Sequence, residues 1–343
     1  MKRCIALGKN GLGNTAPNPM VGALLVHKGK IISEGFTSPF GGPHAEVNAI
    51  SKVKDTTILS EATLYVTLEP CAHYGKTPPC ADLIIKHNIP KVVIGLLDPH
   101  EKVAGKGIQK LKDAGCEVLV GVLEEECREH HKRFLAYHNQ KRPYIILKWA
   151  QTQDGYIAPD PSVRASSPEP FWITNSYSKQ LVHKWRSEEQ AILVGTATAL
   201  QDNPKLNARN YKGKSPVRVV IDKNLKIGSD YHLMDGSQKT IVLTQQQSSK
   251  EYVNGIHYEV IDFSKNVAQQ ITDILYKHHI TSIIIEGGTT TIATFTETNH
   301  WDEARVFTGP TLFKTGIKAP ALKGNLISTT TIKNDLLNQY RND

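Results

Sequence analysis

The stretch GGPHAE at residues 41–46 decides the fold of the first part of the chain, together with TLEPC at 67–71 and TPPC at 77–80. The first motif leads into a helix-like run and the second ends a run rich in β-branched residues, so we expect a helix and a strand to meet there. His44, Cys71 and Cys80 offer one nitrogen and two sulfur ligands. This is a zinc set with the fourth position open, which is typical of a catalytic ion.

Glu46 follows His44 by two positions, and residues so spaced do not share a helix face. It is therefore badly placed as a further ligand but close enough to reach a water on the metal. Zinc lowers the pKa of its bound water to about 7, and a carboxylate there can carry the proton to a leaving amine. Zinc deaminases share the pattern H-x-E … P-C-x-x-C. Here the spacing after Cys71 is C-x8-C, which makes a longer loop beside the metal.

The 343 residues exceed one ordinary domain and predict two. Strand-like and helix-like runs alternate before and after the polar stretch NQKRP at 139–143, so we predict two α/β domains, 1–140 and 144–343. In the first, 124–137 reads as one helix, and His130 and His131 lie in a polar context that favours the surface.

Charge and cysteine content limit the partners and the compartment. The chain has 41 Lys+Arg and 33 Asp+Glu, a net charge of +8, but no consecutive basic block of the kind found in nucleic-acid-binding tails. No apolar run is long enough to span a membrane, and the N-terminus has no secretory h-region. All 5 cysteines precede residue 128 and their number is odd. Reduced thiols and a cytoplasmic location are expected.

In the second half, a strand at 282–285 runs into EGGTTT at 286–291 and then a helix-like segment. Glycines let the backbone approach a phosphate, and the amides at a helix N-terminus favour anions. A tight strand–helix turn without a ligand gives the same pattern. The G-x-G-x-x-G dinucleotide motif is absent.

Several stretches together resemble the bifunctional riboflavin-biosynthesis deaminase/reductase family. TAPNPMVG (15–22), GGPHAE, YVTLEPCAHYGKTPPC (65–80) and DP (98–99) are similar to its deaminase half; KWAQTQDG (148–155), WIT (172–174), RS (186–187), AILVGTAT (191–198), DNPKLNAR (202–209), VVID (219–222) and EGGT (286–289) are similar to its reductase half. The long inter-cysteine loop is characteristic of this family, not of tRNA or cytidine deaminases. The resemblance implies an N-terminal cytidine-deaminase-like three-layer domain and a C-terminal dihydrofolate-reductase-like domain, with Zn²⁺ and NADPH as cofactors.

The resemblance also implies roles for particular residues. Zinc would bind His44, Cys71 and Cys80, with Glu46 as the proton shuttle. The pyrimidine or its ribose phosphate would face Asn18, His73, Lys76, Thr77 and Asp98 in the first domain and Arg186, Leu206, Arg209 and Glu286 in the second. NADPH would contact Ala150, Trp172, Thr198, Asp202, Gly288, Thr289, Thr290, Thr291, Ile292, Ala293 and Thr294. The cationic side chains suit a phosphate. The reductase proton donor is not identified; Lys148, Asp202 and Glu286 are candidates.

The activity so implied begins with hydrolytic deamination of 2,5-diamino-6-ribosylamino-4(3H)-pyrimidinone 5′-phosphate. NADPH then reduces the ribosyl group to ribityl. We expect a small-molecule substrate, no nucleic acid, no membrane and a homo-oligomer.

The chain departs from the family pattern at a few positions. Pro170 stands where a substrate-binding Ser is expected, Lys223 follows VVID where Ser is common, and QTQDG replaces ASLDG. These departures motivate one alternative, a chain that retains only the deaminase activity. A second alternative is a zinc deaminase acting on a nucleic-acid base, with a basic binding domain. The missing basic runs, the GKTPPC loop and the EGGT turn argue against it.

Overall fold

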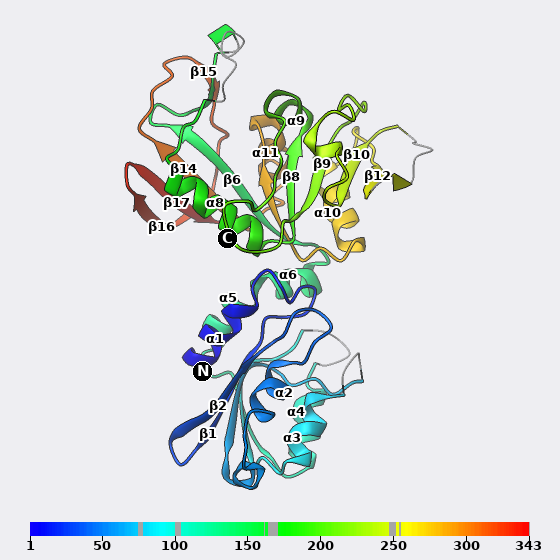
Figure 1. Ribbon diagram of the computed structural model, residues 1–343, viewed down its shortest axis with the longest axis vertical. Helices are drawn as coiled ribbons and strands as arrows, with labels where there is room; N and C mark the ends of the chain where they lie inside the picture. The colour runs from blue at the N-terminus through cyan, green and yellow to red at the C-terminus, as the bar shows by residue number, and fades with distance from the viewer. Residues whose placement is uncertain are drawn as a thin grey trace. The chain divides into compact units, whose positions relative to one another are not determined.

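The computed structural model describes residues 1–74, 78–99, 104–160, 162–163, 171–246, 252–253 and 255–342. The chain divides into two compact units, Met1–Lys141 and Arg142–Asp343, called the first and the second unit below. In Figure 1 the first unit runs from blue to teal and the second from green to red.

A five-stranded sheet with the order β2-β1-β3-β4-β5 forms the centre of the first unit as far as it is described. β1 pairs antiparallel with both its neighbours, whereas β3, β4 and β5 run parallel. Lys28 and Gly29 join β1 to β2, both with positive φ, as the right-handed twist of a tight hairpin requires. The strands are β1 (Gly22–His27), β2 (Lys30–Phe36), β3 (Thr63–Leu68), β4 (Lys91–Leu96) and β5 (Glu117–Val120).

Helices cover both faces of this sheet (Figure 1). Alternate residues of β1 point to opposite sides: Leu25 packs in the core with α2 and α3, while Leu24 packs with Leu7 of α1. The result is a three-layer sandwich. Its helices are α1 (Lys2–Gly8), α2 (Ala45–Ile50), α3 (Cys80–Lys86), α4 (Lys106–Asp113), α5 (Glu124–His130) and α6 (Lys132–Gln140), with short 3₁₀ turns at Lys9–Gly11 and Thr56–Glu61.

Two predictions for this unit are wrong. The single helix expected over 124–137 is broken at His131 into α5 and α6. His130 and His131 are not at the surface but 5% and 1% exposed. A ring nitrogen of His131 lies 3.0 Å from Thr67 Oγ1, and Nε2 of His130 bonds Met20 O at 2.7 Å. The missing side chain of Gly8 makes room, since a Cβ there would lie 2.5 Å from His130 Nε2.

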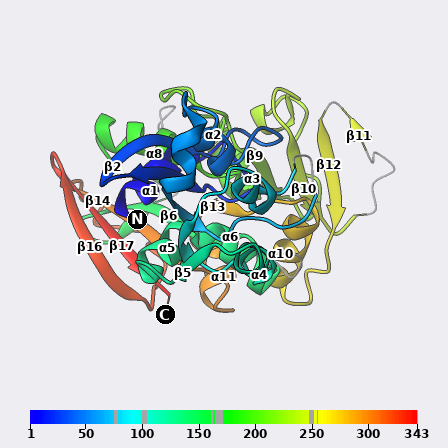
Figure 2. The same ribbon diagram turned by 90° about the horizontal axis from the view of Figure 1, so that it is seen from below.

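Within its described residues, the second unit has a ten-stranded sheet in the order β11-β12-β10-β9-β8-β13-β6-β14-β17-β16. The strands from β12 to β14 are parallel. At the two ends of the sheet (Figure 2), β11 pairs antiparallel with β12, β17 with β14, and β16 with β17. They are β6 (Tyr144–Thr152), β8 (Ala191–Gly195), β9 (Val217–Ile221), β10 (Thr240–Thr244), β11 (Tyr252–Val253), β12 (Ile256–Val260), β13 (Ser282–Glu286), β14 (Glu303–Gly309), β16 (Asn325–Ile332) and β17 (Asp335–Arg341). β7 (Tyr156–Pro159) pairs separately with β15 (Gly316–Lys318).

Two apolar cores cover this sheet. Ile283 and Ile285 of β13 pack with α10 and α11, while Ile284 packs on the opposite face with Trp185 of α8. Because β8, β13 and β6 are parallel neighbours, their carboxyl ends lie at one edge of the sheet, where ligands commonly bind. The helices are α8 (Ser176–Glu188), α9 (Thr196–Asp202), α10 (Val267–Lys277) and α11 (Thr289–Thr296), with a 3₁₀ turn at His232–Met234.

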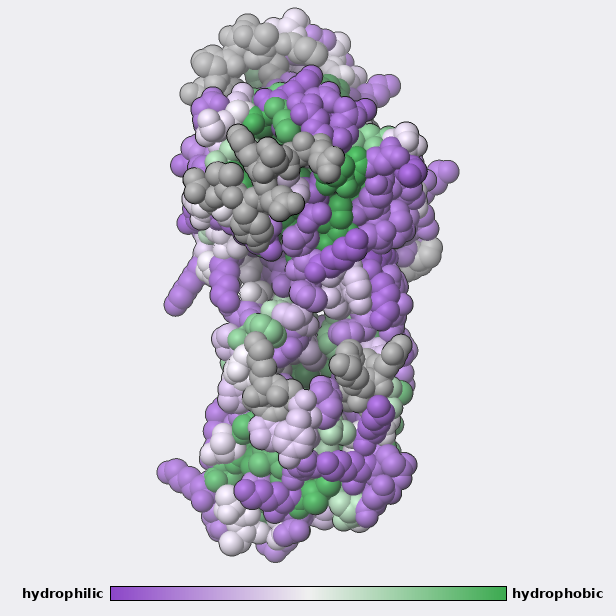
Figure 3. Space-filling view, turned by 90° about the vertical axis from the view of Figure 1, so that its right-hand side faces the viewer, coloured by the Kyte–Doolittle hydropathy of each residue, from purple (hydrophilic) through white to green (hydrophobic). Residues whose placement is uncertain are grey.

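The surface is mainly polar on the side that Figure 3 displays, with smaller groups of hydrophobic side chains between the hydrophilic ones. In the part of the chain that the structure describes, no helix combines the length and hydropathy needed to cross a membrane.

Candidate metal centre and cofactor site

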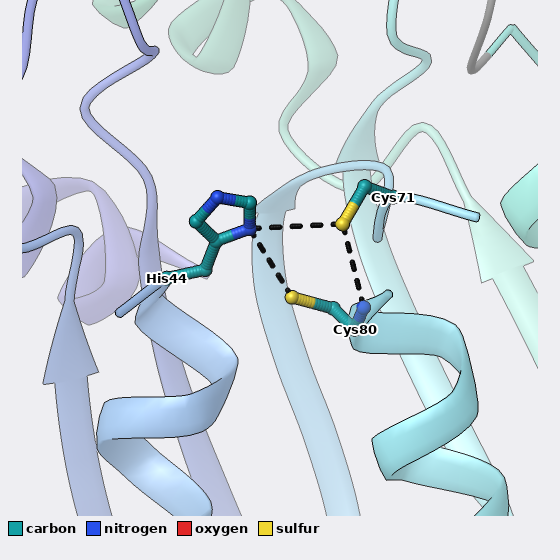
Figure 4. Close-up of side chains that lie close together, drawn as sticks. All are labelled: His44, Cys71 and Cys80. Atoms are coloured by element: carbon teal, nitrogen blue, oxygen red, sulfur yellow. Dashed lines mark hydrogen bonds between the residues drawn. The ribbon is translucent and has the colours of Figure 1, made fainter. Parts of the chain in front are cut away.

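The three predicted zinc ligands meet in the first unit, each at the end of an element (Figure 4). His44 precedes the first residue of α2 in extended conformation, and Cys80 is the first residue of α3. Cys71 follows β3 after Glu69 and Pro70. The strand end and the two helix starts thus bring side chains that are far apart in sequence to one point.

The ligand atoms are close enough to share one ion. Nδ1 of His44 lies 3.3 Å from Cys80 Sγ and 3.6 Å from Cys71 Sγ, and all three atoms lie within 4.8 Å of one another. Zinc with Zn–S near ~2.3 Å and Zn–N near ~2.0 Å places tetrahedral ligands about 3.5–3.8 Å apart. The donor set and its spacing therefore fit a zinc ion. The backbone N–H of Cys80 also donates to Cys71 Sγ at 3.3 Å (Figure 4).

Glu46 lies in the first turn of α2 and is 4% exposed. Burial, with a smaller contribution from Cys71, raises the pKa of its carboxyl group to about 7, against opposing contributions from His44 and Cys80. The pKa of Cys71 is lowered to about 4 by hydrogen bonding from Cys80 and His44. A buried carboxyl group beside a thiolate and an imidazole can exchange a proton near neutral pH.

The other predicted residues of this site lie on segments next to the strands. Asp98 follows β4 and is 6% exposed, His73 is exposed two residues after Cys71, and Asn18 is half-buried before β1. Lys76 and Thr77 lie outside the described residues, as does His100. Sequence reasoning missed Glu69, a buried carboxylate in the TLEPC stretch itself. Its signal was present, because an acidic residue that ends a buried strand is uncommon without partners.

In the second unit, three charged side chains meet where the carboxyl end of β13 lies beside the middle of β6. Glu286 is paired in register with Lys148 on the neighbouring strand. Its carboxylate accepts from Arg186 Nη2 at 2.9 Å and Nε at 3.3 Å, and Lys148 Nζ lies 3.6 Å away. The side chains of all three are 12–15% exposed.

The three charged groups of this cluster shift one another's pKa values. Burial alone would raise the pKa of Glu286, but Arg186 and then Lys148 outweigh it and lower the pKa to about 2. Burial lowers the pKa of Lys148, against the attraction of Glu286 and assisted by the repulsion of Arg186. One carboxylate faces two cations, so the cluster carries a net positive charge when all three are ionised. Such a site can accept an anionic group.

Asn207, which sequence reasoning missed, joins the predicted arginines. Arg186 Nη1 donates to Asn207 O at 3.4 Å, and Arg209 donates to Asn207 Oδ1 at 3.0 Å. His183, likewise missed, lies with Nδ1 2.9 Å from Asn207 O. Leu206 is buried with a φ of 50°, which turns the chain there.

Two glycine turns adjoin at the ends of β8 and β13. Gly195 precedes α9, and Gly288 precedes α11. A Cβ on Gly195 would lie 2.4 Å from Thr291 Oγ1, and one on Gly288 would lie 3.9 Å from Thr198 Oγ1. Side chains are thus absent where two helix starts come together. The backbone amides at the two helix starts suit the phosphates of a dinucleotide.

The remaining predicted cofactor residues lie on several different elements. Ala150 lies on β6, Thr289 and Thr290 begin α11, and Asp202 is exposed at the end of α9. Trp172 is 61% exposed, with Lys179 Nζ 3.5 Å from its ring centre. Ile292 is in the apolar core, so its side chain does not face the turn, while Ala293 and Thr294 lie half-buried further along α11. Pro170 lies outside the described residues.

Lys223, the second departure from the family pattern, directly follows Asp222 after β9. It lines a hollow of about 630 Å³ together with Gln245 after β10 and with Asp262 and Phe263 after β12. Its Nζ lies 5.3 Å from the centre of the Phe263 ring. The replacement therefore puts a cation at the same edge of the sheet as the glycine turns.

Two family models match the chain, one for each unit, and together they define the class of protein. Residues 1–96 match the family model of the cytidine and deoxycytidylate deaminase zinc-binding region, and residues 143–337 match that of the RibD C-terminal domain. The fold and the two sites thus define a zinc-dependent deaminase joined to a reductase.

Proteins similar to the chain over most of its length identify its family. The riboflavin biosynthesis protein RibD of Aquifex aeolicus is 39% identical over 324 residues, with 92% of this chain and 88% of that protein covered. RibD of Actinobacillus pleuropneumoniae is 38% identical, covering 99% and 94%. A diaminohydroxyphosphoribosylaminopyrimidine deaminase/5-amino-6-(5-phosphoribosylamino)uracil reductase from Thermotoga maritima has a TM-score of 0.89 at 37% identity, covering 100% and 97%. The chain belongs to the RibD family of bifunctional deaminase/reductases of riboflavin biosynthesis.

These matches confirm the family and both enzyme classes. They also confirm the fold class, an N-terminal cytidine-deaminase-like domain and a C-terminal dihydrofolate-reductase-like domain. Zn²⁺ and NADPH as cofactors follow from the same two domains.

Proposed function

We propose that residues 1–140 deaminate 2,5-diamino-6-ribosylamino-4(3H)-pyrimidinone 5′-phosphate and that residues 144–343 reduce the ribosyl group of the product to ribityl. The observation that carries the proposal is the convergence of His44, Cys71 and Cys80 within 4.8 Å beside the buried Glu46. The substrate named in the Thermotoga maritima protein supports the same choice, since 100% of this chain is covered at 37% identity.

In the first unit, His44, Cys71 and Cys80 would hold the zinc ion. Zinc bound there supplies a Lewis acid that makes water nucleophilic at neutral pH. Glu46 takes a proton from the attacking water and passes it to the 2-amino group, which leaves as ammonia. Asn18, His73, Lys76, Thr77 and Asp98 are proposed to bind the pyrimidine and its ribose phosphate.

In the second unit, NADPH would supply the hydride for C1 of the ring-opened imine form of the ribosylamino group, whose nitrogen would take up a proton. The glycine turns after β8 and β13 would bind its phosphates, with contacts from Ala150, Trp172, Thr198 and Asp202 and from residues 288–294. Arg186 and Arg209, joined by Asn207, would bind the substrate phosphate. Leu206 and Glu286 would complete the substrate site, and Glu286 holds Arg186 in place.

The partner of this enzyme is proposed to be the small phosphorylated pyrimidine, without nucleic acid or membrane. The charge of +8 is spread over the chain, and the cations that meet at a site, Lys148 and Arg186, share the single carboxylate of Glu286. We further propose a cytoplasmic homo-oligomer. Sedimentation of the purified chain tests the oligomer, and a salt titration with single-stranded RNA tests the absence of nucleic-acid binding.

One assay tests the function as a whole. The purified chain is incubated with the diamino substrate with and without NADPH, while ammonia and NADPH absorbance are followed. We expect ammonia in both arms and NADPH oxidation only after deamination. Ammonia without NADPH oxidation, even when the deaminated product is supplied, would favour the alternative in which only the deaminase is active. Ammonia from an RNA or DNA base alone would favour the nucleic-acid alternative.

A further inference from the structure

Glu69 belongs to the TLEPC stretch, yet neither the metal centre nor the proposed proton transfer uses it. Its carboxylate is buried, with the residue 4% exposed, and accepts hydrogen bonds from the backbone N–H groups of four residues. Oε2 accepts from Asp98 at 3.3 Å and Gly105 at 3.0 Å. Oε1 accepts from Gly107 at 3.0 Å and Ile108 at 3.2 Å.

Each carboxylate oxygen has a separate structural effect. Oε2 joins Asp98, after β4, to Gly105, before α4, because both donate to this one atom. Oε1 caps α4, whose first turn has no acidic residue of its own and whose N-cap, Gly105, has no side chain. A negative charge at a helix N-terminus satisfies amides that have no partner within the helix. Glu69 is therefore a cap supplied from a distant strand.

The same residue is joined closely to the metal ligands. Its own backbone N–H donates to Leu96 O at 2.9 Å, and Cys71 stands two positions further on. Gly107 packs against the next residue, since a Cβ on Gly107 would lie 2.0 Å from Pro70 O. On the other side, Cys71 O accepts from Ala81 N at 3.1 Å. The turn that carries Cys71 is thus connected both to α3 and, through Glu69, to Asp98 and α4.

We propose that Glu69 is a positioning residue of the deaminase site, which sets the place of Asp98 relative to the metal ligands. The inference rests on the proposed function, in which Asp98 binds the pyrimidine substrate. Loss of the carboxylate leaves the N–H groups of Asp98 and Gly105 without their acceptor, so both residues have to move. A displacement of about 1 Å in a positioning group lowers a rate by about 100-fold.

The test uses the full zinc-loaded chain and the variant Glu69→Gln. Gln has the same size, but its amide nitrogen cannot accept, so two of the four hydrogen bonds are lost. We expect kcat/KM for ammonia release to fall about 100-fold, with zinc content by atomic emission unchanged. NADPH oxidation with separately supplied deaminated product stays unchanged and serves as an internal control. The matched control is Glu61→Gln, an exposed carboxylate paired with Lys28, which should leave both reactions unchanged.

A double-mutant cycle separates positioning from plain stabilisation. If Glu69 acts through Asp98, Glu69→Gln should have little further effect in an Asp98→Ala background, so the two losses are far from additive. Additive losses, or a fall in ammonia release that only follows lost zinc or lost folded protein, would overturn the inference. If Glu69→Gln does not fold, Glu69→Asp, which keeps the charge on a shorter side chain, goes through the same cycle and decides by the same criteria.

The two proposals fail in different ways. A wild-type chain that releases no ammonia from the diamino substrate overturns the proposed function and this inference with it. A wild-type chain that does so, with Glu69→Gln equally fast, overturns the positioning role alone.

Discussion

The two candidate sites are built in opposite ways. The metal centre takes its three ligands from a stretch whose ends, His44 and Cys80, are 36 positions apart. Its reactive groups are two cysteines, an imidazole and a buried carboxyl group whose pKa is about 7. The reductase cluster takes Lys148, Arg186 and Glu286 from three separate elements, and its carboxylate is firmly ionised. The first site depends on a few atoms at fixed distances, while the second depends on the balance of charges over a wider region. Loss of one residue should therefore affect the two sites to different degrees.

The largest effect is expected from Cys80→Ala. Two protein ligands remain, which is too few for a stable catalytic zinc site, so zinc and deamination should both be lost. NADPH oxidation with supplied deaminated product should persist. Atomic emission and an ammonia assay measure the outcome. A variant that keeps a full equivalent of zinc would show that Cys80 is no ligand. The metal centre would then not depend on a few atoms at fixed distances.

A smaller effect is expected from Glu46→Gln. The amide keeps the size of the side chain but cannot move a proton, so ammonia release should fall about 10²–10⁴-fold while zinc is retained. Metal analysis and initial rates on the same preparation distinguish this variant from Cys80→Ala. Unchanged ammonia release would remove Glu46 from the mechanism.

In the second unit, Glu286→Gln should leave Arg186 and Lys148 without their counter-charge. Removing one partner of a buried ion pair costs about 3–5 kcal/mol of folding free energy. We expect a lower melting temperature in calorimetry and weaker NADPH-dependent reduction, with ammonia release retained. Glu259→Gln, which removes a more exposed carboxylate paired with His278, is the matched control and should have a smaller effect. Equal melting temperatures for the two variants would contradict the charge balance described above.

The smallest effect is expected for the stability of the second unit at low pH. The pKa of Glu286 is lowered in the folded state from 4.5 to about 2, so its contribution to stability is fully present above pH 4.5 and is lost as pH falls towards 2. The shift corresponds to about 3 kcal/mol. Melting of the wild type between pH 5 and about pH 2.5 should show this loss, and Glu286→Gln should show a flatter dependence. Parallel curves for the two proteins would contradict the cause assigned to the shift.

The metal centre was predictable from the residues themselves, because zinc chemistry needs particular ligand types and the HAE and PC motifs supply them. The reductase residues could be predicted only through the family resemblance. Arg186 and Arg209 have nothing in their local sequence that separates them from surface arginines, and Asn207, which joins them, is an ordinary loop residue in the sequence.

The fold followed the sequence where hydrophobic periodicity was strong. The strand expected at 282–285 is β13 (Ser282–Glu286), and the helix expected beside EGGTTT is α11 (Thr289–Thr296), which begins within that stretch. Local pattern failed where packing between distant segments decides. His130 and His131 look polar in sequence, but Gly8 and Thr67, far away in the chain, provide a buried place for them. The position of Glu69 after a buried strand indicated that it has partners, but not which ones, since these lie 29 to 39 residues further on.

The edge strands of the ten-stranded sheet affect how readily copies of the chain associate through their sheets. An edge strand offers unpaired backbone groups to any other extended chain, which invites uncontrolled sheet growth. Within the described residues, β11 is two residues long, Tyr252–Val253. At the opposite end, β16 is longer and exposes Leu326 and Ile327, but its pairing with β17 shifts register between Leu326 and Ser328. A short strand and an irregular one are poor templates, so a wide sheet can exist at high concentration without polymerising through its edges.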